Sequence, residues 1–282
     1  MQIAFLTFSG LPALWPDDAL AAEELRARGH QVTPLVWNAP GTLAALDAFD
    51  VCVVRSPWDW FHHRAAFRQF LDALPHARCR VVNDPVPLRA FADKTYLSTL
   101  AARGLDVVPT VELEGEGLPT QVAQTLAVRG WREAVLKPAF TANAIGARRV
   151  RAGEALADVP ALDAGEKWLL QPFVPSIAEG EFSFVFFGGE FSHAVHKRPA
   201  TGEWRVQHDY GGDSTPWAPD AAAVAHARAL LHAAAPGTVY ARVDAVDYDG
   251  RLHLMELEVV EPELFFRHAP RSVARFADAM GA

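Results

Sequence analysis

The sequence contains little cysteine, no excess of positive charge and no long apolar run, and each shortage excludes a class of protein. Its only cysteines, Cys52 and Cys79, provide neither a disulfide framework nor a Cys-x-x-Cys metal site. We expect Cys52, which lies in an apolar run, to be a buried structural thiol. The formal net charge of −8 argues against a nucleic-acid-binding protein, because phosphate backbones require a basic face.

Membrane and nicotinamide-binding patterns are also missing. No stretch approaches the about 18 apolar residues of a spanning helix. The apolar start Met1–Phe8 is too short for a signal peptide and lacks a basic leader, so we expect a cytoplasmic protein. The segment Phe8–Trp15 lacks the Gly-x-Gly-x-x-Gly turn of dinucleotide-binding domains. This excludes a nicotinamide-dependent oxidoreductase.

The first segment, residues 1–90, alternates short apolar runs with helical patterns. This rhythm predicts an α/β domain with a parallel sheet covered by helices. Asp17 or Asp18 is expected to cap the first helix. The predicted strands are Ile3–Phe8, Gln31–Trp37, Asp50–Arg55 and Arg80–Asn83, and the predicted helices are Ala19–Arg28 and Phe61–Leu74.

Two α+β segments follow, at residues 91–170 and 171–282. The first has predicted helices at Lys94–Arg103 and Thr120–Arg129, a strand at Glu133–Lys137, and loop or weak helix around Leu156–Glu166. From Lys167 onward, β-rich runs favour antiparallel strands. These runs are Lys167–Gln171, Glu181–Phe187, Glu190–Lys197, Tyr240–Val246 and Leu252–Val259, with helices at Pro219–Ala234 and near Ala269–Met280.

Three carboxylates near the C-terminus predict a metal site. Alternation places Glu256 and Glu258 on one face of a strand, where they repel each other unless a hard cation such as Mg²⁺ lies between them. The alternative is a solvated strand face. A two-residue Asp249-Gly250 turn would pair Asp244 with Met255 and turn Asp244 to the wrong face, whereas an odd-length loop or a bulge would not. The metal hypothesis therefore requires a three- or five-residue connection.

Two further stretches fit a nucleotide. Lys94 begins a helix, and Lys137 ends an apolar strand before a loop of small residues, 138–146. Exposed amides beside a lysine can hold a polyphosphate, although a lone lysine is more often a solvated charge. The run Leu169–Val174 is an apolar strand that breaks into Pro-Phe-Val. Its free backbone groups suit a flat base, but it also fits an ordinary strand-to-loop junction.

These stretches, in this order, resemble the ATP-grasp superfamily over roughly Val81–Glu263. The most similar subgroup is that of the glutathione-synthetase-like and RimK-like ligases. Within it, Arg55–Asp59 and Glu256–Pro262 are most similar to the D-cycloserine synthetase group. The resemblance implies the ATP-grasp fold, in which a small parallel α/β pre-domain is followed by two α+β lobes that enclose the nucleotide.

The resemblance also implies residue roles around ATP and two Mg²⁺ ions, for which Mn²⁺ can substitute. Relatives often have Asn at the last metal position, where this chain has Glu258. The ribose contact falls on Glu181, with Glu179 as the alternative. The implied ATP contacts are Lys94 and Lys137 for the phosphates and Gln171, Phe173 and Val174 for adenine, and the implied metal ligands are Asp244, Glu256 and Glu258.

Positive groups are expected around the transferring phosphoryl group, where they stabilise developing negative charge. The substrate is expected at the carboxyl end of a parallel strand and under the loop 204–212, which closes over the substrate in glutathione-synthetase-like enzymes. The catalytic candidates are Lys197, Arg205, His208 and Arg242, and the substrate candidates are Arg55, Ser56, Asp59, Tyr210 and Gly212.

The sequence thus predicts an ADP-forming ligase that activates a carboxylate or similar group as a phosphate and forms a C–N bond. One alternative is an intramolecular cyclase of the D-cycloserine synthetase type, and another is a non-catalytic nucleotide-binding regulatory module. The expected partner is a small amino-acid-like substrate, with no nucleic acid and no membrane, and relatives suggest a homodimer. The sequence does not identify the acid or the amine.

Overall fold

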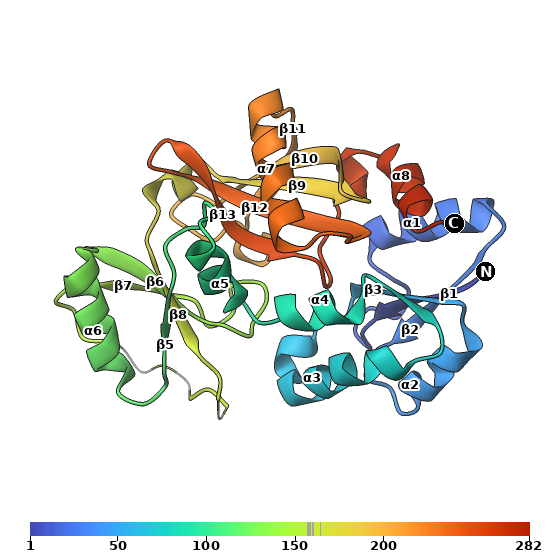
Figure 1. Cartoon of the computed structure of the whole chain (residues 1–282), viewed down its shortest axis with the longest axis horizontal. Coiled ribbons are helices and arrows are strands. Elements are labelled where there is room, and N and C mark those ends of the chain that lie inside the picture. The colour runs from blue at the N-terminus through green and yellow to red at the C-terminus, as the bar shows by residue number, and fades with distance from the viewer. Residues whose placement is uncertain (157–158, 160, 164) are drawn as a thin grey trace.

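The computed structural model describes residues 1–156, 159, 161–163 and 165–282. The predicted loop or weak helix at 156–166 therefore lies partly outside the described residues. Three sheets follow one another along the chain (Figure 1). In the described part of the chain, no helix is both long and apolar enough to cross a membrane.

The first sheet is parallel, with the strand order β2-β1-β3-β4. All six residues of its central strand β3 are buried, as expected for a parallel strand covered on both faces. The strands are β1 (Gln2–Thr7), β2 (Gln31–Val36), β3 (Val51–Ser56) and β4 (Arg80–Val82), and the helices are α1 (Pro16–Ala27), α2 (Thr42–Ala45), α3 (Arg64–Ala73) and α4 (Pro85–Phe91).

Helix α1 begins three residues before the predicted start. Pro16 occupies the first turn, where its missing N–H and fixed φ are tolerated. Asp17 and Asp18 lie within that turn and are buried, and neither caps the helix. The predicted cap is therefore wrong. Both carboxylates instead accept long-range contacts, Asp18 from Arg55 and Asp17 from Arg267.

The second sheet is antiparallel, with the order β5-β8-β6-β7. It packs against α6 through an apolar cluster that includes Leu126, Leu136 and Trp168. The lobe boundary expected from the sequence, at residue 170, falls inside β8. We therefore propose that this lobe ends after Pro172. Its elements are α5 (Tyr96–Ala102), β5 (Val111–Leu113), α6 (Leu118–Arg129), β6 (Glu133–Pro138), β7 (Arg148–Arg151) and β8 (Trp168–Pro172).

The third sheet is antiparallel, with the order β11-β10-β9-β12-β13. Helix α8 follows it and returns to the first sheet, where it lies beside α1 (Figure 1). The rings of Phe5 and Phe276 meet edge to face with centroids 6.5 Å apart. The elements are β9 (Glu181–Phe187), β10 (Glu190–Arg198), β11 (Asp213–Trp217), α7 (Ala221–Ala234), β12 (Tyr240–Tyr248), β13 (Arg251–Glu258) and α8 (Ser272–Ala279).

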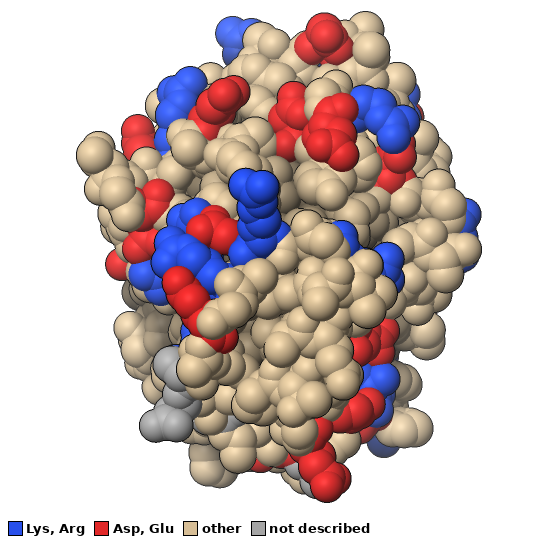
Figure 2. Space-filling model, turned by 90° about the vertical axis from the view of Figure 1, so that its left-hand side faces the viewer, with Lys and Arg blue, Asp and Glu red and all other residues tan. Residues whose placement is uncertain are grey.

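The surface carries charges of both signs. On the face shown in Figure 2, which is the left-hand side of Figure 1, Lys and Arg side chains lie next to Asp and Glu side chains.

Candidate active site

A cavity of about 710 Å³ is lined by residues from the loops and strands of all three sheets. The first sheet contributes aromatic residues that follow β1 and β3. The second contributes Lys137 from β6 and the loop after it, and the third contributes acidic and basic side chains from β10, β12 and β13. Pockets of about 300–1,000 Å³ are typical of small-molecule sites. The cavity is therefore the candidate active site.

A β-bulge at Met255 brings the acidic residues of β12 and β13 together. The turn between the strands has two residues, because Tyr248 pairs with Arg251. Ala245 pairs with Leu254, but Asp244 pairs with Glu256, so Met255 is the extra residue. The expected three- or five-residue connection is wrong. The bulge alone moves Asp244 to the face of Glu256.

Asp244 is held by three neighbours on the floor of the cavity. It is 2% exposed and accepts hydrogen bonds from the guanidinium of Arg242 at 2.9 Å and from Lys197 Nζ at 3.1 Å. Ser183 Oγ donates to its Oδ1. Burial alone would raise the pKa of Asp244, but Arg242 and Lys197 hold it well below its usual range.

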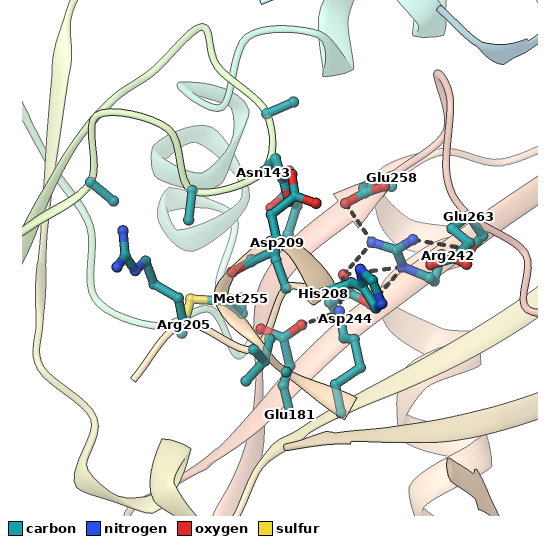
Figure 3. Close-up of a pocket in the computed structure, with 18 of the residues that line it drawn as sticks. Asn143, Glu181, Arg205, His208, Asp209, Arg242, Asp244, Met255, Glu258 and Glu263 are labelled. Carbon is teal, nitrogen blue, oxygen red and sulfur yellow. Dashed lines mark hydrogen bonds and ion pairs between the residues drawn. The ribbon is translucent and has the colours of Figure 1, made fainter. Parts of the chain in front are cut away.

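The other two carboxylates also pair with cations. Lys94 Nζ lies 2.9 Å from Glu256 Oε1, and Arg242 Nη2 lies 2.5 Å from Glu258 Oε1. Figure 3 shows Arg242 between Asp244 and Glu258. Burial raises the pKa of Glu258 to about 8, and the nearby Glu256 and Asp244 add to this rise while Arg242 opposes it.

The carboxylates fit a divalent cation in their chemistry. Asp244, Glu256 and Glu258 line one cavity from two paired strands, and oxygen donors suit Mg²⁺. No group of three or more His, Cys, Asp or Glu side chains has metal-binding geometry in the described part of the chain. The ion pairs with Lys94, Lys197 and Arg242 explain this, because each carboxylate is turned toward a cation.

Lys137 ends β6 and reaches the same cavity. Burial lowers its pKa to about 8; Glu256 opposes this shift and Lys94 contributes to it. Lys94 itself is 7% exposed and donates to the carbonyl of Thr141. Burial, the largest single influence, lowers its pKa, but the combined attraction of Glu256, Glu258 and Glu261 raises it above the usual value. The structure thus brings the two predicted lysines together at one end of the carboxylate cluster.

The residues predicted around adenine line the cavity where β8 ends. Gln171 is buried, and its Nε2 donates to Thr110 Oγ1 at 2.9 Å. The guanidinium of Arg149 lies 3.7 Å from the ring centroid of Phe173, and Val174 is 5% exposed. Of the two predicted ribose residues, Glu181 lines the cavity and pairs with Lys197, whereas Glu179 is exposed and does not line it.

Two loops meet over the cavity. Asn143 and Ala144, in the loop after β6, both have φ of +54°, a left-handed conformation that is uncommon for residues other than glycine. The Asn143 amide donates to the carboxylate of Asp209 in the loop that precedes β11, and Figure 3 shows the two side chains directed toward each other. This hydrogen bond therefore joins the loop after β6 to the loop before β11 across the cavity.

The loop before β11 also contains four predicted residues. Arg205 and His208 line the cavity. Arg205 lies 3.5 Å from the ring centroid of Tyr210, and Tyr210 does not line the cavity. Gly212 does line it, but a Cβ there would lie 2.1 Å from the carbonyl oxygen of Val206. Glycine is therefore required at position 212 because the backbone of the loop passes close to itself there.

The substrate residues predicted at the end of β3 and just after it lie outside the cavity lining. Arg55 is fully buried, and its guanidinium contacts Asp18 at 2.9 Å and the carbonyl of Pro262 at 2.9 Å. Ser56 is also fully buried. Asp59 accepts a hydrogen bond from Trp37 Nε1 at 2.6 Å. These side chains brace the strand end, and a ligand contact for Arg55 or Ser56 is incompatible with their burial.

Sequence reasoning missed several residues of the cavity. Trp60 reaches it from the segment after β3, and Glu261 reaches it from the segment after β13. Glu261 belongs to the acidic run that begins at Glu256, so its charge was a usable signal. Asp209 and Asn143 gave no such signal, because they meet only when the two loops fold together.

Comparisons with known proteins support this architecture. Residues 3–83 match the family described as the N-terminal domain of the D-cycloserine synthetase DcsG. The chain is 35% identical over 251 residues to the cycloserine biosynthesis protein DcsG of Streptomyces lavendulae, covering 82% of each chain. It is 27% identical over 223 residues to a glutathione synthetase of Bradyrhizobium diazoefficiens, covering 72% of this chain and 65% of that protein.

Solved structures show the same similarity. The crystal structure of the D-cycloserine synthetase DcsG superposes with a TM-score of 0.88 at 28% identity, covering 99% of this chain and 98% of that one. A D-alanine–D-alanine ligase of Bacillus anthracis superposes with a TM-score of 0.66 at 14% identity, covering 100% and 95%, which shows a shared fold. The chain belongs to the DcsG family within the ATP-grasp ligases.

Proposed function

We propose that this protein is an ADP-forming ligase that activates a carboxylate of a small amino-acid-like substrate. The carboxylate oxygen attacks the γ-phosphorus of ATP, the bond to ADP breaks, and an acyl phosphate forms. A nitrogen nucleophile then displaces phosphate to form the C–N bond. One observation carries the proposal: Asp244, Glu256 and Glu258 line the same cavity as Lys94 and Lys137.

The chain's own residues supply binding and charge, which dominate phosphoryl transfer. Lys94 and Lys137 would contact the phosphates. Asp244, Glu256 and Glu258 would hold Mg²⁺, two ions in our proposal, which neutralise phosphate charge when bound. Gln171, Phe173 and Val174 would enclose adenine, and Glu181 would contact the ribose hydroxyls; all four line the cavity.

Cations on the substrate side would stabilise the charge that develops on the acyl group. Lys197 and Arg242 are fixed by Asp244, at 3.1 and 2.9 Å, so their positions are set before substrate arrives. Arg205 and His208 also line the cavity, on the loop before β11. That loop is joined by Asp209 to the loop after β6, which would exclude water from the reacting groups.

A second candidate is an intramolecular cyclase, in which one molecule carries both the activated carboxylate and the nucleophile. The 35% identity to a cycloserine biosynthesis protein favours it. A screen of amino acids and dipeptides for ADP release, singly and in pairs, separates the two reactions. Release with one substrate and a product lighter by one water indicates cyclisation, whereas release only with pairs indicates ligation.

The same screen tests the proposal as a whole. Hydroxylamine added to the assay traps an acyl phosphate as a hydroxamate, whatever the natural amine is. We expect ADP and hydroxamate in equal amounts. ATP binding without ADP release from any acid would contradict catalysis and favour a regulatory nucleotide-binding module.

A further inference from the structure

Indole side chains surround one carboxylate at the end of the cavity next to the first sheet. Trp60 Nε1 donates to Glu261 Oε1 at 2.5 Å, and Trp58 Nε1 donates to the backbone carbonyl of Glu261 at 3.1 Å. The rings of Trp15 and Trp58 meet edge to face with centroids 5.3 Å apart. All four residues line the cavity.

Glu261 is half-buried and, among the described residues, differs from the neighbouring carboxylates in having no direct cationic contact; Lys94, which pairs with Glu256, acts on it only from a greater distance. In the part of the chain that the structure describes, no Lys, Arg or His nitrogen lies within 4 Å of its carboxylate, and its one side-chain hydrogen bond uses Oε1. Burial raises the pKa of Glu261. The other buried or half-buried acidic side chains of the cavity pair with Lys or Arg; these are Glu181, Asp244, Glu256, Glu258 and Glu263.

Aromatic walls beside an uncompensated carboxylate select positive charge. The faces of indole rings attract ammonium and guanidinium groups, and a partly desolvated carboxylate gains most from a cation. Trp15 and Trp58 are only half-buried, so part of each indole is accessible from the cavity. An anionic group would be repelled by Glu261, and a neutral group would leave its charge unpaired.

The charges of the cavity therefore suit a substrate that is itself dipolar. In the proposed function Lys94 and Lys137 bind the ATP phosphates, and Lys197 and Arg242 attract negative groups on the substrate side. Glu261 lies in the same cavity beside the indoles. A molecule with a carboxylate at one end and an ammonium group at the other satisfies both.

We propose that Glu261, Trp60, Trp58 and Trp15 form a subsite for a primary ammonium group, and that the acid activated by this protein is an amino acid or a short derivative with a free amine. The activated-acid half of this statement rests on the proposed function. The ammonium subsite stands on its own geometry and can be tested by binding.

The test compares Glu261→Gln with Glu263→Gln. The first removes the charge but keeps an oxygen that can accept from Trp60 Nε1. The second removes a charge from the same cavity at a carboxylate that already has Arg267 as its partner. With the amino acid that gives the most ADP release, we expect Glu261→Gln to raise KM for that amino acid at least tenfold. KM for ATP should change less than twofold in Glu261→Gln. In Glu263→Gln, KM for the amino acid and KM for ATP should each change less than twofold.

Analogues of that amino acid complete the activity test. Its N-acetyl and des-amino derivatives should be activated by the wild type at least tenfold less efficiently in kcat/KM, and Glu261→Gln should lose most of this discrimination. Equal use of the amine-bearing and amine-lacking acids would overturn the subsite while leaving the ligase proposal intact.

A binding measurement covers the case in which no acid releases ADP, which would contradict the ligase proposal. Alaninamide and serinamide, which carry an ammonium group but no carboxylate, serve as probes, and tryptophan fluorescence reports their binding next to Trp58 and Trp15. We expect saturable quenching in the wild type and at least tenfold weaker binding in Glu261→Gln. The absence of quenching by both probes, or equal affinity in the two proteins, would overturn the ammonium subsite.

Discussion

Asp244 lies opposite Glu256 across β12 and β13 because Met255 bulges out of the ladder. A regular two-residue hairpin would have paired Asp244 with Met255 and turned its carboxylate away from the cavity. The bulge therefore decides whether the acidic residues form one cluster. Bulges are common beside active sites, where they redirect a side chain.

The ionisation of Lys137 predicts a pH dependence of ATP binding. Burial lowers the pKa of this lysine to about 8 in the empty cavity, and a bound triphosphate favours its charged form. ATP affinity should therefore be constant below pH 7 and fall above pH 8 by up to about tenfold per pH unit, because binding then requires uptake of one proton.

Calorimetry in buffers of different ionisation enthalpy measures that proton uptake. The variant Lys137→Arg keeps its charge across this range and should take up fewer protons than the wild type on binding ATP between pH 8 and 9, since proton exchange at Glu258, whose pKa is about 8, is common to both proteins. Equal proton uptake by the wild type and this variant would contradict the role given to Lys137.

The contact between Asn143 and Asp209 predicts that the two cavity loops stabilise each other. A hydrogen bond to a charged group contributes about 1.5–3 kcal/mol, so Asn143→Ala should raise KM for ATP by about tenfold or more. Asp209→Ala should have a similar effect. The double variant should be no worse than either single variant, because all three lack the same contact.

A double-mutant cycle on KM for ATP measures this coupling. Asp213→Ala is a suitable control, since Asp213 is an exposed carboxylate that lines the cavity and, among the described residues, makes no hydrogen bond or ion pair with the loop after β6. Additive effects of Asn143→Ala and Asp209→Ala would show that the loops close independently.

Arg55 is predicted to stabilise the fold, in contrast to its expected role in substrate binding. Arg55 Nη2 lies 2.9 Å from Asp18 Oδ1, and both side chains are almost fully buried. Removal of one partner from such a buried pair costs about 3–5 kcal/mol. Arg55→Ala should lower the free energy of unfolding by that amount. Arg78→Ala removes an 83% exposed arginine and should cost less than about 1 kcal/mol.

Urea denaturation of both variants measures the difference. A joint replacement of Arg55 and Asp18 by apolar residues of similar volume should recover most of the loss, because neither charge is then left unpaired. If Arg55→Ala had wild-type stability and a higher KM only for the amino acid, Arg55 would instead be a substrate-binding residue.

Much of the third sheet could be predicted from local pattern. Glu181–Phe187 was predicted with the observed bounds, and the spacing of Glu256 and Glu258 correctly placed both on one face. The edge strand Arg148–Arg151 was missed, because three of its four residues are arginine and no apolar alternation marks it. Local pattern thus identified strands with a buried face and missed a strand that has little to bury.

The rest of the site depends on contacts between distant segments. The strand-end rule favoured Arg55 as a ligand residue, but Asp18 from α1 neutralises it in the interior. The strand-end rule did indicate where the cavity lies, since Trp58, in the segment that follows β3, lines it. No local pattern could reveal the bulge at Met255 or the meeting of Asn143 with Asp209, because both are set by pairing partners.

The most direct test of the account is Mg²⁺-dependent ADP release by Glu256→Gln, measured with the best acid from the substrate screen. This change removes one carboxylate charge and leaves the side-chain shape intact, and circular dichroism checks the fold. Glu190→Gln is the control, since Glu190 is 74% exposed and pairs with Arg228 at the surface. We predict that kcat/KM falls at least about 100-fold, equivalent to about 2.7 kcal/mol, in Glu256→Gln and stays within twofold in the control. Wild-type ADP release by Glu256→Gln would contradict the claim that these carboxylates hold the metal on ATP.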